Sequence, residues 1–283
     1  MKISFIGVGS AFTTKEYYQS NMLITARSGK RMLLDCGSDA RFALSECNIH
    51  NDNLSEEIDA VYISHLHADH IGGMEWFAFN TYFVPNRVKP KLFMERKIMN
   101  EIWNHSLKGG LGCIEGKEMH LSDYFGCRPL SKNASFWWEG IRFTLVEMPH
   151  VITDGGNHNS FGLLVKDGHK EPLVFVTTDT QFQPEFISKI SKKASLIFHD
   201  CETSPFKSTI HTHYEDLCTL PAKIKQKMWL YHYQPDPDYK PEADGFKGFI
   251  KKGQEFDFTT EKNVLIRRRN ISGVGLAAMI RAH

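Results

Sequence analysis

The sequence lacks the features of a secreted or membrane protein. Its six cysteines are scattered, with no C-x-x-C pair, so we expect free thiols in a reducing compartment. The first residues, MKISFIGVGS, are typical of a strand and a glycine turn rather than of a signal peptide. No apolar run is long enough to cross a bilayer. We therefore expect a cytoplasmic protein with no membrane partner.

The sequence also lacks an excess of charge of either sign. Its 34 Lys and Arg residues balance 33 Asp and Glu residues, which gives a net charge of +1. A protein that binds nucleic acid mainly through phosphates usually carries more positive charge, so a nucleic-acid partner is disfavoured, although a local basic patch stays open. With 283 residues, 41% of them hydrophobic, the chain can form one large core or two small domains.

Histidine, in contrast, is abundant, with 14 residues, and several of them end apolar, β-rich runs. Strands are expected at 2–7 and 22–26, and helices at 95–107 and 214–227. Strands dominate, helices lie between them, and polar residues gather at strand ends. This pattern predicts an α/β (α+β) protein built as a layered αββα sandwich rather than as a regular βαβ alternation.

The strongest local signal is the sequence HLHADH, an H-x-H-x-D-H motif that follows the apolar run 61–63. Alternate residues at the end of a strand share a face, so His65 and His67 can point to one metal ion. Asp69 and His70 follow in the turn and can reach a second ion. Imidazole and carboxylate ligands suit zinc, and they also admit manganese or iron.

One motif supplies too few ligands for two metal ions. Three further residues end strand-like runs: His150 after FTLVEMP, Asp179 after VFVTT and His232 after MWLY. If it stood alone, each of them would more often be a hydrogen-bonded histidine or an ordinary capping aspartate than a metal ligand. In this order after H-x-H-x-D-H, they are predicted to complete the metal site.

The series FIGVGSAF, LLDCG, HLHADH, MPH, TTDT and LYH resembles the metallo-β-lactamase superfamily over roughly residues 2 to 235. The resemblance implies the αββα fold and two zinc ions, with manganese as the alternative. It implies these positions: His65, His67 and His150 on one ion, Asp69, His70 and His232 on the other, Asp179 bridging both, and Asp35 orienting a ligand histidine. Cys36 is expected to be a buried thiol rather than a ligand.

Two close cations activate water and neutralise phosphate oxygens, so cleavage of a phosphodiester is expected, with Asp69 among the catalytic residues. The leaving oxygen also needs a proton donor. The pair His199-Asp200 resembles the His-Glu step of the phosphodiesterase branch typified by tRNase Z, in which a downstream histidine donates the proton. Both His211 and His213 qualify, with Asp200 as the orienting carboxylate. The alternative, that H-T-H only flanks a helix, stays open.

The substrate is the harder question. A tRNase Z usually carries a long arm that grips tRNA, and the segment from His150 to Asp179 has no room for one beside two strands. The run HTHYEDLCTLPAKIKQKMWLYHY resembles the phage and bacterial anti-Pycsar enzymes, phosphodiesterases that destroy immune messengers such as cyclic CMP and cyclic UMP. This resemblance implies a homodimer that hydrolyses 3′,5′-cyclic nucleotides, including cyclic AMP and GMP, to 5′-monophosphates and so counters antiphage signalling. The alternatives are RNA 3′ processing, hydrolysis of another small phosphodiester, and lactonase or thioesterase chemistry on the same fold.

We expect a single domain over residues 1–260. The aromatic, glycine-rich segment 76–116 is the candidate lid and dimerisation surface. The tail, 261–283, contains an Arg triplet followed by small residues, and its role is left open between an extra helix, a partner-binding segment and a non-native addition.

Overall fold

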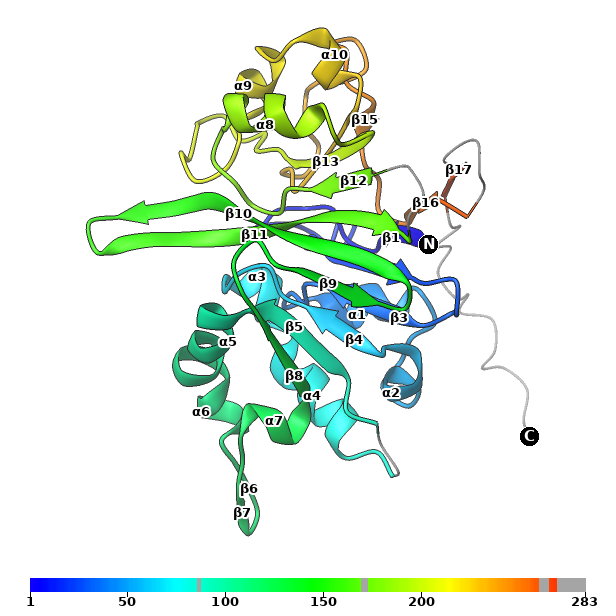
Figure 1. The fold of residues 1–283 in the computed structure, drawn as a ribbon, viewed down its shortest axis with the longest axis vertical. Coiled ribbons are helices and arrows are strands. Elements are labelled where there is room, and N and C mark those ends of the chain that lie inside the picture. Colours follow the sequence, from blue (N-terminus) through cyan, green and yellow to red (C-terminus); the bar gives the residue numbers. More distant parts are fainter. Residues whose placement is uncertain (86–87, 169–172, 260–264, 269–283) are drawn as a thin grey trace, which may run out of the picture.

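The computed structural model describes residues 1–85, 88–168, 173–259 and 265–268, which form two facing sheets with helices on their outer sides (Figure 1). In the first sheet the order is β17 (Leu265–Arg268), β16 (Gln254–Asp257), β1 (Lys2–Phe5), β2 (Met22–Thr25), β3 (Arg31–Leu34), β4 (Ala60–Tyr62), β5 (Lys91–Glu95) and β8 (Gly126–Leu130). In the second it is β15 (Gly248–Phe249), β14 (Met228–Tyr231), β13 (Leu196–Asp200), β12 (Leu173–Val176), β11 (Gly156–Asp167), β10 (Ile141–Thr153) and β9 (Ser135–Trp138). A short hairpin pairs β6 (Cys113–Ile114) with β7 (Lys117–Glu118).

The helices fall into two groups, one beside each sheet (Figure 1). Beside the first sheet lie α1 (Ala40–Ser45), α2 (Leu54–Glu57), α3 (Ala68–Ile71), α4 (Met74–Tyr82), α5 (Arg96–Ile102), the π-helical turn η1 (Trp103–Leu107), α6 (Lys108–Leu111) and α7 (Leu121–Tyr124). Beside the second lie α8 (Pro184–Ser191), α9 (Tyr214–Cys218) and α10 (Ala222–Lys225). The predicted αββα sandwich is therefore confirmed.

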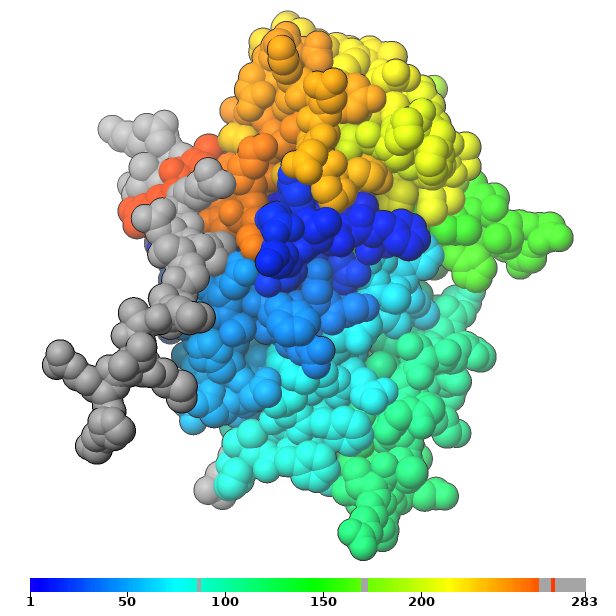
Figure 2. Space-filling model, turned by 180° about the vertical axis from the view of Figure 1, so that it is seen from behind, coloured from blue at the N-terminus to red at the C-terminus, as the bar shows by residue number. Residues whose placement is uncertain are grey.

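Aromatic side chains fill the space between the two sheets. Phe5 of β1 packs edge-on against Phe198 of β13, with ring centroids 5.0 Å apart, and Phe198 also contacts Phe256 of β16 at 4.6 Å. All three side chains are buried. The N-terminal and C-terminal parts of the chain therefore meet in one core, and the back of the molecule shows the first strands in blue against the orange C-terminal strands (Figure 2).

Two expected elements differ from the structure. The helix predicted over 214–227 is divided into α9 and α10, because Pro221 lacks the N–H that a continuous helix needs and instead precedes the first turn of α10. The strand expected to end at His150 continues to Thr153, and its pairing with β11 shifts between Met148 and Val151. Pro149 lies within this irregularity, where a strand tolerates proline.

The segment 76–116 contains both core and surface structure. Its strand β5 lies between β4 and β8, whereas α5, η1 and α6 cover the outside of the sheet. A role as lid or dimer surface stays a prediction. Of the tail, residues 265–268 pair with β16, and 261–264 and 269–283 lie outside the described residues. Within the described part of the chain, no helix has the length and apolar character to cross a membrane.

Candidate metal centre

The seven predicted ligands gather at one edge of the sandwich, where several strands end. The motif at 65–70 follows β4 and runs into α3, while Asp179 follows β12 and His232 follows β14. His150 lies in β10 at the bulge. Their metal-binding atoms form two groups, each within 4.8 Å: His65, His67, His150 and Asp179, and Asp69, His70, Asp179 and His232. Asp179 belongs to both groups, as a bridging carboxylate would, and also to a third group with Asp200, His211 and His232.

Four of these histidines use their outer ring nitrogen to contact the surrounding protein. The partners are Asp35 Oδ2 for His70 (2.8 Å), the Ile210 carbonyl for His150 (2.8 Å), Ser64 Oγ for His65 (3.0 Å) and Ser20 Oγ for His232 (3.0 Å). The hydroxyls of Ser64 and Ser20 donate to Asp35 and to the Gly9 carbonyl, so each can accept from imidazole. These contacts turn Nδ1 outward and leave each Nε2 facing the centre, where it could bind a cation.

The inner nitrogen and oxygen atoms of the cluster are crowded. His67 Nδ1 lies 3.2 Å from His65 Nε2 and 3.1 Å from His150 Nε2. In the described part of the chain, four buried inner atoms have no hydrogen-bond partner: His70 Nε2, His232 Nε2, Asp179 Oδ1 and Asp179 Oδ2. Leaving such an atom unpaired costs about 1–3 kcal/mol. Divalent cations would bind these nitrogen and oxygen atoms. A set of imidazole and carboxylate ligands fits zinc or manganese.

The backbone around the centre is held in an uncommon conformation. Asp35, Thr178 and His232 have positive φ angles of 62°, 55° and 65°. Positive φ is rare for residues other than glycine and is a true outlier for β-branched threonine. Such strain persists where the surroundings fix the backbone, often at functional sites. Nearby, a Cβ at Gly37 would lie 2.2 Å from the Asp69 carbonyl oxygen, so glycine permits the close approach of the loop after β3 to α3.

The structure separates the two candidate proton donors. His211 Nδ1 lies 3.1 Å from Asp200 Oδ2 and 3.9 Å from Asp179 Oδ2, beside the cluster. Burial opposes a charge on His211, but the Asp200 carboxylate and its hydrogen bond raise the pKa of His211 to about 9. His213 instead precedes α9, accepts from the Glu215 N–H and contacts the Ser204 carbonyl at 3.0 Å. Geometry favours His211 as the proton donor and gives His213 a helix-capping position.

Asp35 holds His70 within the cluster, and Asp200 holds His211 beside it. The backbone N–H of Thr180 donates to Asp200 Oδ2 at 3.0 Å, which fixes the carboxylate that contacts His211. Sequence reasoning missed Ser20 and Ser64 as partners of the ligand histidines. Ser64 directly precedes the motif and could have been found by its position, whereas no sequence pattern distinguishes Ser20.

Cys36 is fully buried, as predicted, and burial next to Asp35 raises the pKa of its thiol.

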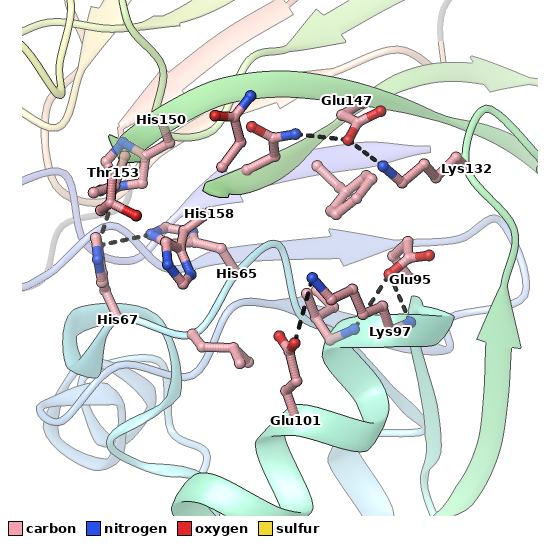
Figure 3. Close-up of a pocket in the computed structure, with 16 residues that line it drawn as sticks. His65, His67, Glu95, Lys97, Glu101, Lys132, Glu147, His150, Thr153 and His158 are labelled. Carbon is pink, nitrogen blue, oxygen red and sulfur yellow. Dashed lines mark hydrogen bonds and ion pairs between the residues drawn. The ribbon is translucent and has the colours of Figure 1, made fainter. Parts of the chain in front are cut away.

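A cavity of about 340 Å³ opens beside the first group of ligands (Figure 3). His65, His67 and His150 lie at one end, and Lys132 and Glu147 at the other. Its volume is at the lower end of the range of about 300–1,000 Å³ that is usual for small-molecule sites. Sequence reasoning did not single out the residues of the far end.

Comparison with known proteins adds to this geometry. The sequence pattern of the family described as "Anti-Pycsar protein Apyc1" matches residues 1–256. The chain belongs to the Apyc1 family. The match includes every candidate ligand and proton donor and ends before the tail.

Curated members of the Apyc1 family match over nearly their whole length. The Anti-Pycsar protein Apyc1 of Paenibacillus harenae is 34% identical over 259 residues, which cover 91% of this chain and 100% of the relative. The protein of the same name from Bacillus phage vB_BveM-Goe7 is 30% identical over 263 residues, 90% of this chain and 97% of the relative. Among solved structures, the metallo-β-lactamase fold protein YhfI from Bacillus subtilis superposes with a TM-score of 0.67 at 17% identity, covering 90% of this chain and 98% of YhfI. That likeness confirms the fold.

Proposed function

We propose that this chain is a hydrolase that uses two divalent cations, zinc or manganese, to convert 3′,5′-cyclic nucleotides to 5′-monophosphates. One observation carries the proposal: two ligand groups share Asp179, whose buried oxygens have no hydrogen-bond partner within the described residues, and they border a cavity of about 340 Å³. Membership of the Apyc1 family, whose curated members are named anti-Pycsar proteins, supports a messenger-degrading role. The same resemblance supports a homodimer, which we include in the proposal.

Each residue of the cluster would have a distinct part in this reaction. Bound cations would supply a nucleophile from water near neutral pH and neutralise the phosphate oxygens. His65, His67 and His150 would hold one ion, Asp69, His70 and His232 the other, and Asp179 would contact both. Water adds to phosphorus and the bond to the 3′ oxygen breaks. Asp69 accepts the proton of the water, and His211, oriented by Asp200, donates a proton to the leaving 3′ oxygen.

The structure favours a small substrate over RNA. Between His150 and Asp179 the described residues form the end of β10, β11 and β12, with no additional arm. Because the described residues form no arm to grip tRNA, RNA 3′ processing is only the second candidate function. It stays a candidate because His211 and Asp200 are placed as in a phosphodiesterase.

A substrate panel tests the proposal. Metal-supplemented protein would be incubated with cyclic CMP, UMP, AMP and GMP, with bis(p-nitrophenyl) phosphate, with a precursor tRNA, and with a lactone and a thioester. We expect 5′-monophosphates from cyclic nucleotides and intact tRNA. Cleavage of tRNA or of the generic diester alone would reject the cyclic-nucleotide function and keep a phosphodiesterase. Hydrolysis of a lactone or thioester in place of every phosphodiester would reject phosphorus chemistry.

A further inference from the structure

The loop that carries His211 is closed by the backbone of Glu202. The loop comprises residues 203–212, between β13 and α9, and it begins and ends where Glu202 pairs with His213. At this closure the Glu202 N–H donates to the Thr212 carbonyl at 2.8 Å. The backbone bonds fix the two ends of the loop, so the direction of His211 also depends on how the interior of the loop is held.

The interior of the loop contains a strained turn next to His211. Thr209, two residues before His211, has a φ of 66°. A positive φ is an outlier for a β-branched residue and persists only where the surroundings hold the backbone. The Thr209 side chain is exposed, so its own packing does not hold the turn. Contacts to the neighbouring peptide groups must do so.

The Glu202 side chain makes one of these contacts. It is 3% exposed, and its Oε2 accepts from the Ser208 N–H across the loop at 2.9 Å. Ser208 directly precedes Thr209, so this bond fixes the peptide group at the start of the strained turn. On the other side of the turn, the Ile210 carbonyl accepts from His150 Nδ1 at 2.8 Å. A carboxylate that accepts from a backbone N–H forms one of the stronger hydrogen bonds in proteins.

The metal centre does not account for the Glu202 side chain. Among the described residues, Glu202 belongs to none of the three groups of candidate metal ligands and does not line the cavity beside them. Closure of the loop at His213 uses only backbone atoms, which a residue of another type would also offer. A buried carboxylate costs free energy unless hydrogen bonds compensate it. The bond to Ser208 is therefore the particular contribution of this side chain to the loop.

We propose that Glu202 is a positioning residue for the proton donor: its bond to Ser208 holds the turn at Thr209 and so keeps His211 directed at the metal centre. Glu202 acts through His211 and has no direct part in the reaction. The proposal rests on the function proposed above, in which His211 donates a proton to the leaving 3′ oxygen.

Two substrates that differ in their leaving group test this role. Cyclic CMP releases a 3′ alkoxide, a strong base that needs a proton as its bond to phosphorus breaks. Bis(p-nitrophenyl) phosphate releases p-nitrophenolate, a weak base that leaves without one. A displaced His211 should therefore slow hydrolysis of cyclic CMP and leave hydrolysis of the nitrophenyl ester almost unchanged. General damage to the fold or to the metal centre would slow both.

Two substitutions separate the reach of the Glu202 side chain from its charge. Glu202→Asp keeps the charge but is too short to reach the Ser208 N–H, whereas Glu202→Gln keeps an acceptor oxygen at the same reach. A displacement of about 1 Å can cost about 100-fold in rate, so Glu202→Asp should lower kcat for cyclic CMP by about 10- to 100-fold, with KM within about twofold. Glu202→Gln should restore most of this loss. Glu185→Asp makes the same change at an exposed position on α8 and should behave as the wild type.

Two further readouts follow the proposed chain of contacts. In a His211→Ala protein, Glu202→Asp should lower cyclic CMP turnover no further, because both changes remove the same proton transfer. Amide hydrogen exchange at Ser208 should be at least about 10-fold faster in Glu202→Asp than in Glu202→Gln, because only the glutamine keeps the acceptor. Metal content should be the same in all of these proteins.

Several results would overturn the positioning role and leave the proposed function standing. They are unchanged cyclic CMP turnover in Glu202→Asp, an equal loss on both substrates, a loss in Glu202→Gln that Glu202→Asp does not share, and a further loss in the His211→Ala background. If the wild type cleaves bis(p-nitrophenyl) phosphate but no cyclic nucleotide, the proposed function fails and the positioning role with it. Circular dichroism establishes folding, and Glu202→Ala, which loses the same acceptor, replaces Glu202→Asp if that protein does not fold.

Discussion

Replacement of Asp35 by asparagine is expected to weaken metal binding without unfolding the protein. Asp35 Oδ1 accepts the Ser64 N–H at 2.7 Å, and Oδ2 accepts the Ser64 hydroxyl at 2.7 Å and His70 Nδ1 at 2.8 Å. Asparagine has the same shape and tolerates the positive φ of 62° at this position better than most residues. The loop after β3 should therefore keep its path.

The asparagine side chain cannot satisfy both of its neighbours. Its one oxygen can face the Ser64 N–H, but the amide nitrogen then faces the Nδ1–H of His70, donor against donor. His70 loses the acceptor that fixes its orientation toward the centre. Loss of such a partner typically costs about 10- to 100-fold in metal affinity, which is about 1.4–2.8 kcal/mol.

The assay is competition for zinc between the protein and a chromophoric chelator, together with turnover of cyclic CMP. Asp52→Asn, at an exposed position, makes the same chemical change and should bind zinc as the wild type does. Circular dichroism would show that both variants fold. An Asp35→Asn protein that is folded, binds zinc with unchanged affinity and retains full turnover would refute the orienting role of Asp35.

Asp179→Ala should lose tight binding of one or both ions and nearly all turnover, because both ligand groups contain Asp179. If elemental analysis finds two ions in the Asp179→Ala protein and its activity is unchanged, Asp179 is not part of the site. His211→Ala should lower turnover by about 10²- to 10⁴-fold with metal content unchanged. His213→Ala should instead cost about 1 kcal/mol of unfolding free energy through the lost helix cap, and equal kinetic effects of the two changes would reject the assignment. Burial raises the pKa of the Cys36 thiol, so little thiolate forms as the pH rises from 7 to 9. Alkylation of the native protein over this pH range should therefore label the exposed Cys113 and spare Cys36. Detection of alkylated Cys36 by mass spectrometry would contradict this prediction.

The clustering of the candidate ligands was predictable because most of them follow a recognisable strand, although His150 lies inside β10. The motif from His65 to His70 combines alternation on one face with a turn, so its residues are close together in any fold that keeps the strand. His150, Asp179 and His232 lie far apart in the chain, and only their common position after apolar runs relates them. The structure brings their candidate ligand atoms to within 4.8 Å of their partners, Asp179 and His232 from beyond strand ends and His150 from the irregularity inside β10.

Other features depend on geometry that a sequence does not show. His211 and His213 are two residues apart, and which of them faces the cluster is set by the pairing of His213 with Glu202 and by the start of α9. The contact of Glu147 with Asn159 depends on the register of β10 and β11, and the bulge near Pro149 adds a shift that periodicity does not predict. These features are set by contacts between segments that are distant in the sequence, so the local sequence pattern does not predict them.

The most direct measurement is chromatography of cyclic CMP after incubation with chelator-treated protein, with zinc- or manganese-reconstituted protein, and with reconstituted Asp179→Ala. We expect cytidine 5′-monophosphate from the reconstituted wild type and unchanged cyclic CMP in the other two samples. Unchanged cyclic CMP with the fully reconstituted wild type, or equal turnover by the Asp179→Ala protein, would contradict a metal-dependent cyclic nucleotide phosphodiesterase.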